Sequence, residues 1–208
     1  MEKNVVLKWC HFRGAYQSKK EAITVVNKNN NKPNVLDVTN YIIIKFKNNN
    51  ENLTHMKLHK LIYYSYVKYL IEYKKRLILE RPKAWKYGPV FGELYFILKD
   101  YFEKPIVKPL CDGRSQKIIT DEKRKKIIDE VLLLCKNKTA IELSNISHQQ
   151  TPWDETYHYY RYKKNDSTIL DEDLKNFFSN HKLLETIKQD ELQKNFKKKF
   201  GIFGKDWW

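Results

Sequence analysis

Two histidines, His55 and His59, stand four residues apart, a spacing that places both side chains on one face of a helix. Paired in this way, they could supply two ligands to a metal ion. A zinc protease motif needs a glutamate directly after its first histidine, however, and Met56 occupies that position. Because no third ligand is evident, we expect these histidines to lie on the surface beside a buried stripe, with no metal and no cofactor.

Nucleophilic chemistry has three candidates in this chain: Cys10 beside His11, Cys111, and His148 with Asp154. A working nucleophile needs a base, an orienting group and oxyanion donors arranged around it in space. Proximity in the sequence supplies none of this arrangement. Neither GxGxxG nor GxxxxGK[ST], the glycine-rich phosphate-binding motifs, occurs in the chain. These residues favour a protein that is not an enzyme.

The composition suits one domain with extensions, since 208 residues with 41% hydrophobic content are enough for a real core. The net charge of +15 invites a nucleic-acid partner, because lysine-rich faces neutralise phosphates. Lys greatly exceeds Arg, though, and Lys, Asn, Ile, Tyr and Phe are abundant together, as an AT-rich genome would encode. Arg, which makes the bidentate contacts of specific phosphate recognition, is scarce. Nucleic acid therefore stays an alternative partner that the sequence does not favour.

The tyrosine-rich segment 157–162, followed by two lysines, raises the same question, because such rings can stack on bases. Tyrosine and tryptophan also anchor protein–protein interfaces, and we favour that interpretation.

The three cysteines are far apart and in no paired spacing, which suits reduced thiols. The apolar run 41–44 is too short to span a bilayer, and no secretion signal is evident. We expect a cytoplasmic protein without a membrane partner.

The hydrophobic periodicity predicts a mainly helical fold. A first helix should have Asp37 as its N-cap, and the second and strongest helix should begin at Thr54. The apolar positions of the second helix form one buried stripe, namely Leu58, Leu61, Ile62, Ser65 and Tyr69. Two short runs, 77–79 and 83–86, flank a proline turn and predict a small β hairpin between helices 2 and 3.

After Gly88 and Pro89 a third helix should begin, since proline is favourable in the first helical turn. The helix that starts at 120–122 is apolar nearly all round, so we expect it to be the central helix. Thr139 opens a short helix with a capping box, and a later helix starts near Asp171. The sequence thus predicts a compact helical domain with one small β hairpin.

Two blocks place a tryptophan beside a proline at breaks between helices: KAWKYGPV at 83–90 and SHQQTPW at 147–153. A tryptophan must be buried, a proline fixes the backbone angle φ, and a glycine loosens the backbone. Such blocks cost the fold stability, so they should be corners that either shape a surface or present one.

These residues resemble the Panacea domain of the SocA-like antitoxin family. The resemblance runs in order through DVTNY at 37–41, LTHMKLHKLIYY at 53–64, AWKYGPV at 84–90 with ELY at 93–95, LS at 143–144, HQ at 148–149 and PW at 152–153. It covers roughly residues 36–180. His59 stands where the family often has glutamine, which implies that this site is not chemically demanding.

The resemblance implies an antitoxin domain at 35–180, preceded by an N-terminal extension and linker at 1–34. A C-terminal helix and a basic, aromatic tail follow at 181–208. It further implies that the protein neutralises a cognate toxin, encoded nearby, by direct binding. Members of the family neutralise toxins of very different kinds, so the two extensions could carry partner specificity. The alternative is that they are ragged ends.

Two other functions stay open at this point. One member of the family delivers its toxin to a ClpXP-type protease, so this protein could be a proteolytic adaptor whose tail, 197–208, docks on a bacterial AAA+ protease. The lysine-rich face could instead bind nucleic acid, as an autoregulator.

The candidate partner-binding residues come from the two blocks and from the tail, and we expect those in the blocks to hold the architecture first. They are Trp85, Tyr87, Gly88, Pro89, His148, Pro152, Trp153, Trp207 and Trp208. Aromatic anchors inside a lysine-rich rim would favour an acidic face on the partner.

Overall fold

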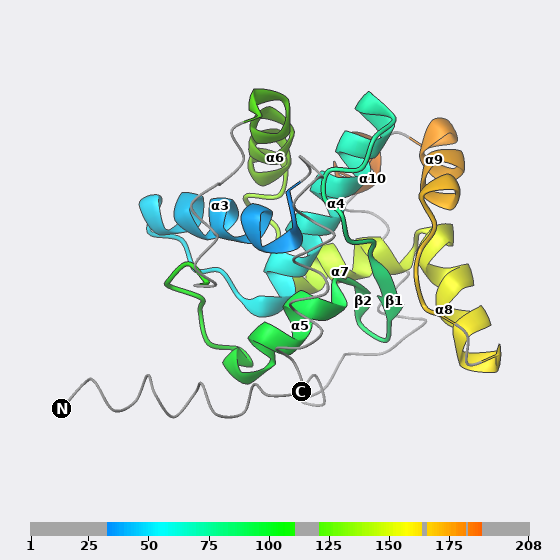
Figure 1. The fold of residues 1–208 in the computed structure, drawn as a ribbon, viewed down its shortest axis with the longest axis horizontal. Coiled ribbons are helices and arrows are strands. Elements are labelled where there is room, and N and C mark those ends of the chain that lie inside the picture. Colours follow the sequence, from blue (N-terminus) through cyan, green and yellow to red (C-terminus); the bar gives the residue numbers. More distant parts are fainter. Residues whose placement is uncertain (1–32, 111–120, 164–165, 182, 189–208) are drawn as a thin grey trace, which may run out of the picture. The chain divides into compact units, whose positions relative to one another are not determined.

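The chain divides into two units, Met1–Lys32 and Pro33–Trp208. The computed structural model describes residues 33–110, 121–163, 166–181 and 183–188, so the first unit, Cys111, Trp207 and Trp208 lie outside the described residues. The elements of the second unit, in chain order (Figure 1), are α3 (Val35–Asn48), α4 (His55–Tyr73), β1 (Lys83–Trp85), β2 (Gly88–Val90), α5 (Gly92–Leu98), the 3-10 helix η2 (Lys99–Tyr101), α6 (Glu122–Leu134), α7 (Ala140–His148), α8 (Thr151–Lys163), α9 (Asp171–Asn180) and α10 (Leu183–Lys188).

The predicted fold class is confirmed. The described residues are mainly helical, and a two-stranded antiparallel sheet lies between α4 and α5. Among the described residues, no helix is both long enough and apolar enough to cross a membrane.

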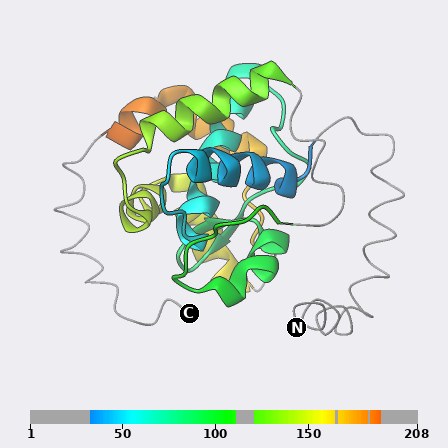
Figure 2. The same ribbon diagram turned by 90° about the vertical axis from the view of Figure 1, so that its left-hand side faces the viewer.

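Helix α4 is the central helix, and α3, α6, α7, α9 and β2 all contact it (Figures 1 and 2). Thr54 caps it as predicted, because its hydroxyl accepts a hydrogen bond from the backbone N–H of Lys57. The predicted stripe is buried, and so are three tyrosines on other sides of the helix, Tyr63, Tyr64 and Tyr66. Burial on nearly every side is what a helix at the centre of a domain requires.

The prediction that the helix starting at 120–122 is central is wrong. Helix α6 buries one face, formed by Ile127, Ile128 and Val131. Leu133, near its C-terminal end, is 75% exposed. Because α6 packs on α4 from one side only, its remaining leucines are left partly or fully in solvent.

Asp37 is also not the N-cap of the first described helix, α3. The side chain of Asn34 accepts from the backbone N–H of Asp37 at 3.0 Å, and the Asp37 carboxylate accepts from the N–H of Asn34 at 2.8 Å. Asn34 is therefore the cap, and Asp37 completes a capping box in the first turn, where the helix dipole favours a negative charge. The predicted capping box at Thr139 and the predicted start of α9 at Asp171 are both confirmed.

The hairpin lies where it was predicted, and the predicted run 83–86 contains one of its strands, β1, but the other strand is a different one. Strand β1 pairs antiparallel with β2, and residues 77–79 form no strand. The chain reverses at Lys86 and Tyr87, directly before Gly88, whose φ of +96° only glycine adopts without strain. The glycine, not the proline at 82, therefore sets the turn.

Pro89 lies in β2 and not in a helix, so the third helix begins later than predicted, at Gly92. A proline has no N–H to give to a sheet, yet no hydrogen bond is lost here. Its partner Ala84 donates in the opposite direction, to the carbonyl of Ser167 at 2.7 Å. The segment around Ser167 thus runs along the other side of β1 and completes its backbone hydrogen bonds.

Candidate functional site

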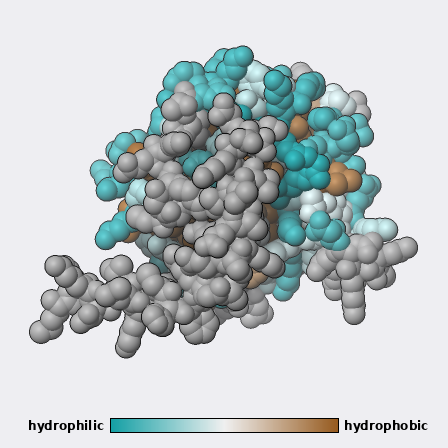
Figure 3. All heavy atoms as spheres, viewed as in Figure 1, coloured by the Kyte–Doolittle hydropathy of each residue, from teal (hydrophilic) through white to brown (hydrophobic). Residues whose placement is uncertain are grey.

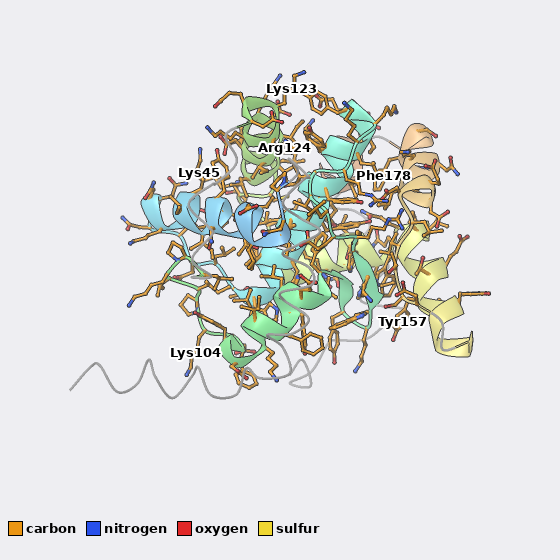
Figure 4. The ribbon with its side chains drawn as sticks, viewed as in Figure 1. Lys45, Lys104, Lys123, Arg124, Tyr157 and Phe178 are labelled. Carbon is orange, nitrogen blue, oxygen red and sulfur yellow. The ribbon has the colours of Figure 1, made fainter. Side chains whose placement is uncertain are left out.

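The two tryptophan–proline blocks meet in the structure, where the hairpin lies beside the start of α8 (Figure 1). The indole N–H of Trp153 donates to the backbone carbonyl of Trp85 at 3.0 Å. The ring of His148 stacks on Trp153 with 4.0 Å between centroids, and the ring of Tyr157, on α8 (Figure 4), stacks on Trp153 at 4.9 Å. The blocks therefore form one corner, as their composition predicts.

A lysine on the central helix α4 donates hydrogen bonds to the hairpin turn from the interior of the protein. The side chain of Lys60, 1% exposed, donates to the carbonyls of Tyr87 at 2.7 Å and Pro89 at 3.1 Å. The hydroxyl of Ser144 donates to the Tyr87 carbonyl as well, at 2.8 Å. Burial lowers the pKa of Lys60 to about 7, while the accepting carbonyls favour its charged form. Both forms of the amine have the two N–H groups that this contact needs.

Gly88 is required at this turn for a second reason besides its backbone angle. A Cβ at this position would lie 2.5 Å from Nζ of Lys60 and 2.7 Å from Oγ of Ser147. Both distances are shorter than any ordinary contact, so a side chain here would push the lysine away from the carbonyls it binds. The hairpin can approach α4 and α7 this closely only because residue 88 has no side chain.

His55 and His59 are buried, each 2% exposed, and the prediction that they lie on the surface is wrong. Nδ1 of His59 faces the backbone N–H of Phe91 at 3.2 Å and must accept that hydrogen bond. Nε2 of His59 therefore carries the proton and donates to Nε2 of His55, 2.9 Å away. This arrangement needs two neutral rings, and burial, the largest cause, lowers the pKa of His59 well below its usual value and that of His55 to about 4.

The residues proposed for chemistry do not come together as a catalytic or metal site in the described part of the chain. No group of three or more His, Cys, Asp or Glu residues that could hold a metal occurs there. Asp154 lies 3.3 Å from His158 instead of pairing with His148. Burial raises the pKa of the Cys135 thiol to about 12, so this thiol stays protonated at neutral pH. Cys10 and Cys111 lie outside the described residues.

Of the candidate partner-binding residues, Trp85 and Tyr87 are partly exposed, whereas the others that the structure describes are buried: Gly88, Pro89, His148, Pro152 and Trp153.

Sequence reasoning missed Lys60 and Ser144, which hold the turn, and Gln150, whose side-chain oxygen accepts from the Tyr63 hydroxyl at 2.8 Å. The position of Lys60 between the apolar residues Leu58 and Leu61 was the one available signal, because a buried lysine must find acceptors.

Replacement of Gly88 by alanine tests the turn. We expect Gly88→Ala to lower the free energy of unfolding by more than about 2 kcal/mol, because it combines backbone strain with displacement of Lys60. The matched control is Gly92→Ala, since a Cβ there would meet no atom closer than 3.8 Å. Urea unfolding followed by circular dichroism measures both variants. Equal stabilities for the two would contradict the close approach described here.

The buried histidines predict a loss of stability in acid. His55, His59 and His148 have lowered pKa values, with burial as the first cause. The unfolded chain therefore binds protons below about pH 6.5 that the folded protein does not, and stability falls as the pH drops from there. Glu80 acts in the opposite direction, because burial raises its pKa to about 7 and its contribution grows as the pH falls towards about 4.5.

The histidines and Glu80 change protonation over overlapping pH ranges, so the test removes the carboxyl group of Glu80 and leaves the histidines in place. We expect Glu80→Gln to lose stability more steeply than the wild-type protein between about pH 6.5 and 4.5, because it lacks the opposing carboxyl group. Thermal unfolding across this pH range measures the slopes. Parallel curves for the two proteins would show that Glu80 does not titrate in the way its burial requires.

The family model described as "Antitoxin SocA-like, Panacea domain" matches residues 58–154. The match begins on the buried face of α4, includes the hairpin and α7, and ends directly after Trp153. No curated protein and no solved structure matches the chain. Over residues 58–154, which contain Lys60, the hairpin turn and both tryptophan–proline blocks, the chain is similar to the Panacea domain of the SocA-like antitoxin family.

Proposed function

We propose that this protein is the antitoxin of a toxin–antitoxin pair and neutralises a cognate toxin, encoded nearby in the genome, by direct and stoichiometric binding in the cytoplasm. The Panacea domain supports a toxin–antitoxin role in general. The observation that carries the binding mechanism is the buried network under the hairpin. Its members fix the backbone of a surface element and are not open to a substrate.

Four reactive side chains near the hairpin have structural partners, namely those of Lys60, Ser144, Ser147 and His59. Lys60 and Ser144 donate to the turn, and the hydroxyl of Ser147 donates to the carbonyl of Ser144 at 2.7 Å. His59 accepts from the backbone at the start of α5. A lysine beside serines could in principle form a catalytic pair, but Lys60 is 1% exposed and both serines are completely buried. Their placement supports a protein that acts by shape and not by catalysis.

A surface element fixed in this way is suited to binding another protein. Binding costs free energy when side chains and loops must first be ordered, so an element that is already held loses less on association. The Trp85 carbonyl and the turn are each held by hydrogen bonds from other elements, from Trp153 and from Lys60. The partly exposed Trp85 and Tyr87 are therefore presented on a preorganised support.

The distribution of charge bears on the nucleic-acid alternative. The described residues contain 24 of the 40 Lys and Arg residues and 19 of the 25 Asp and Glu residues, which leaves a net charge of +5 for them out of +15. Several of the described lysines also form ion pairs with acidic neighbours, as Lys45 does with Asp129 and Lys68 with Glu130. A surface with charges of both signs supports a protein partner over a polyanion. In Figure 3, the residues drawn in colour are mainly hydrophilic.

Co-expression with the product of the adjacent open reading frame tests the proposed function. We expect that product to stop growth when expressed alone, and the two proteins together to restore growth and to elute as one complex from size-exclusion chromatography. Restored growth without any stable complex would contradict neutralisation by binding. A complex whose toxin is lost from cells only when residues 197–208 are present would instead favour the proteolytic adaptor.

A further inference from the structure

The short helix α5 and the residues that follow it expose an apolar surface. Helix α5 buries only Leu94 and Leu98. On its outer side Phe96 is 58% exposed and Ile97 is 38% exposed, and Phe102, just after η2, is 49% exposed. Large apolar side chains scattered singly over a surface are ordinary, but a group of them on one segment marks an interaction site.

This surface continues onto the hairpin. The ring of Trp85 lies edge-on to the ring of Tyr95 at 4.9 Å and to the ring of Phe96 at 6.2 Å. Trp85 comes from β1 and the other two rings come from α5, so aromatic packing joins the two elements. We call the surface formed by Trp85, Tyr95, Phe96, Ile97 and Phe102 the hairpin–α5 face.

The charges around the hairpin–α5 face are of both signs. Its segment carries five charged residues that form no ion pair within the described part of the chain: Glu93, Lys99, Asp100, Glu103 and Lys104 (Lys104 is labelled in Figure 4). Elsewhere acidic residues commonly have basic partners, for example Asp129 and Asp171. Charges without an internal partner are free to pair with groups on another molecule.

The mixture of signs points to one class of occupant. A nucleic acid or an anionic membrane would bring phosphates against three carboxylates, and like charges in contact cost affinity. A protein can offer an apolar pocket for the exposed rings together with charges of both signs at its edge. The aromatic centre and the mixed polar rim are the usual arrangement of a protein–protein interface.

We propose that the hairpin–α5 face is the surface on which the cognate toxin docks, with Phe96 as the central anchor. This proposal rests on the proposed function and adds the location of the contact. The toxin's complementary surface has an apolar pocket that receives the ring of Phe96. Acidic and basic groups on the toxin's rim face Lys99, Lys104 and the carboxylates of residues 93–103. The buried network under the turn keeps Trp85 in place at the edge of this face.

The test measures binding of the adjacent gene product to the full chain carrying single substitutions. We expect Phe96→Ser and Ile97→Ser each to raise the dissociation constant at least about tenfold, because anchor residues at the centre of an interface carry most of its binding energy. The matched control is Leu133→Ser on α6, which removes an apolar side chain that is 75% exposed on another part of the protein. This control should bind within about twofold of wild type. Melting temperatures of all variants should stay close to wild type, since each replaced side chain is exposed.

The outcomes separate the two proposals. If the wild-type protein binds tightly and all three variants bind equally well, the toxin docks elsewhere and this inference is overturned while the proposed function stands. If Phe96→Ser breaks self-association of the chain but leaves toxin affinity unchanged, the face is a contact between two copies, and the inference is again overturned. If the wild-type protein forms no complex with the gene product, the proposed function fails and the docking surface fails with it.

Discussion

The hairpin turn places two backbone carbonyls, those of Tyr87 and Pro89, against the interior of the protein. A buried carbonyl without a donor costs about 1–3 kcal/mol, so the turn can lie there only if donors are supplied. Lys60 supplies them to both carbonyls from the central helix, and Ser144 adds one from α7. A buried lysine would itself be costly, and the same two hydrogen bonds satisfy it. Each group thus makes the other's position acceptable.

The rest of the corner follows from that contact. Gly88 must lack a side chain because the lysine and Ser147 occupy the space beside it. With the turn fixed on α4 and α7, the Trp85 carbonyl is held within reach of the Trp153 indole, and this bond ties the hairpin to α8. At the other end of the hairpin, directly before α5 begins, Nδ1 of His59 accepts a hydrogen bond from the backbone N–H of Phe91. Three helices therefore set the position of the hairpin and of the aromatic rings beside it, which is what a protein that recognises its partner by shape requires.

Features decided within a few residues could be predicted from the sequence, and features decided by distant packing could not. The N-cap of Thr54, the capping box at Thr139 and the start of α9 depend on local hydrogen bonds, and all three are confirmed. The spacing of His55 and His59 correctly predicted that their side chains lie together. Their burial, however, depends on α5 and the hairpin, which follow later in the sequence and pack against them. The role of Lys60 depends on a turn far along the chain, so a lysine that holds the corner looked like one of many in a lysine-rich sequence. The central position was likewise assigned to the wrong helix, because a run of leucines shows apolar character but not which side of it is covered.

Amide hydrogen exchange in the folded Lys60→Met variant, compared with Lys57→Met one turn earlier on α4, tests most directly whether Lys60 holds the hairpin. If Lys60 holds the hairpin, the amides of Ala84 and Phe91, which donate to Ser167 and His59, exchange at least about tenfold faster in Lys60→Met, while those of α3 and α6 exchange as in the wild-type protein. Lys57→Met should leave both groups of amides unchanged. Wild-type exchange rates for Ala84 and Phe91 in Lys60→Met would contradict the account.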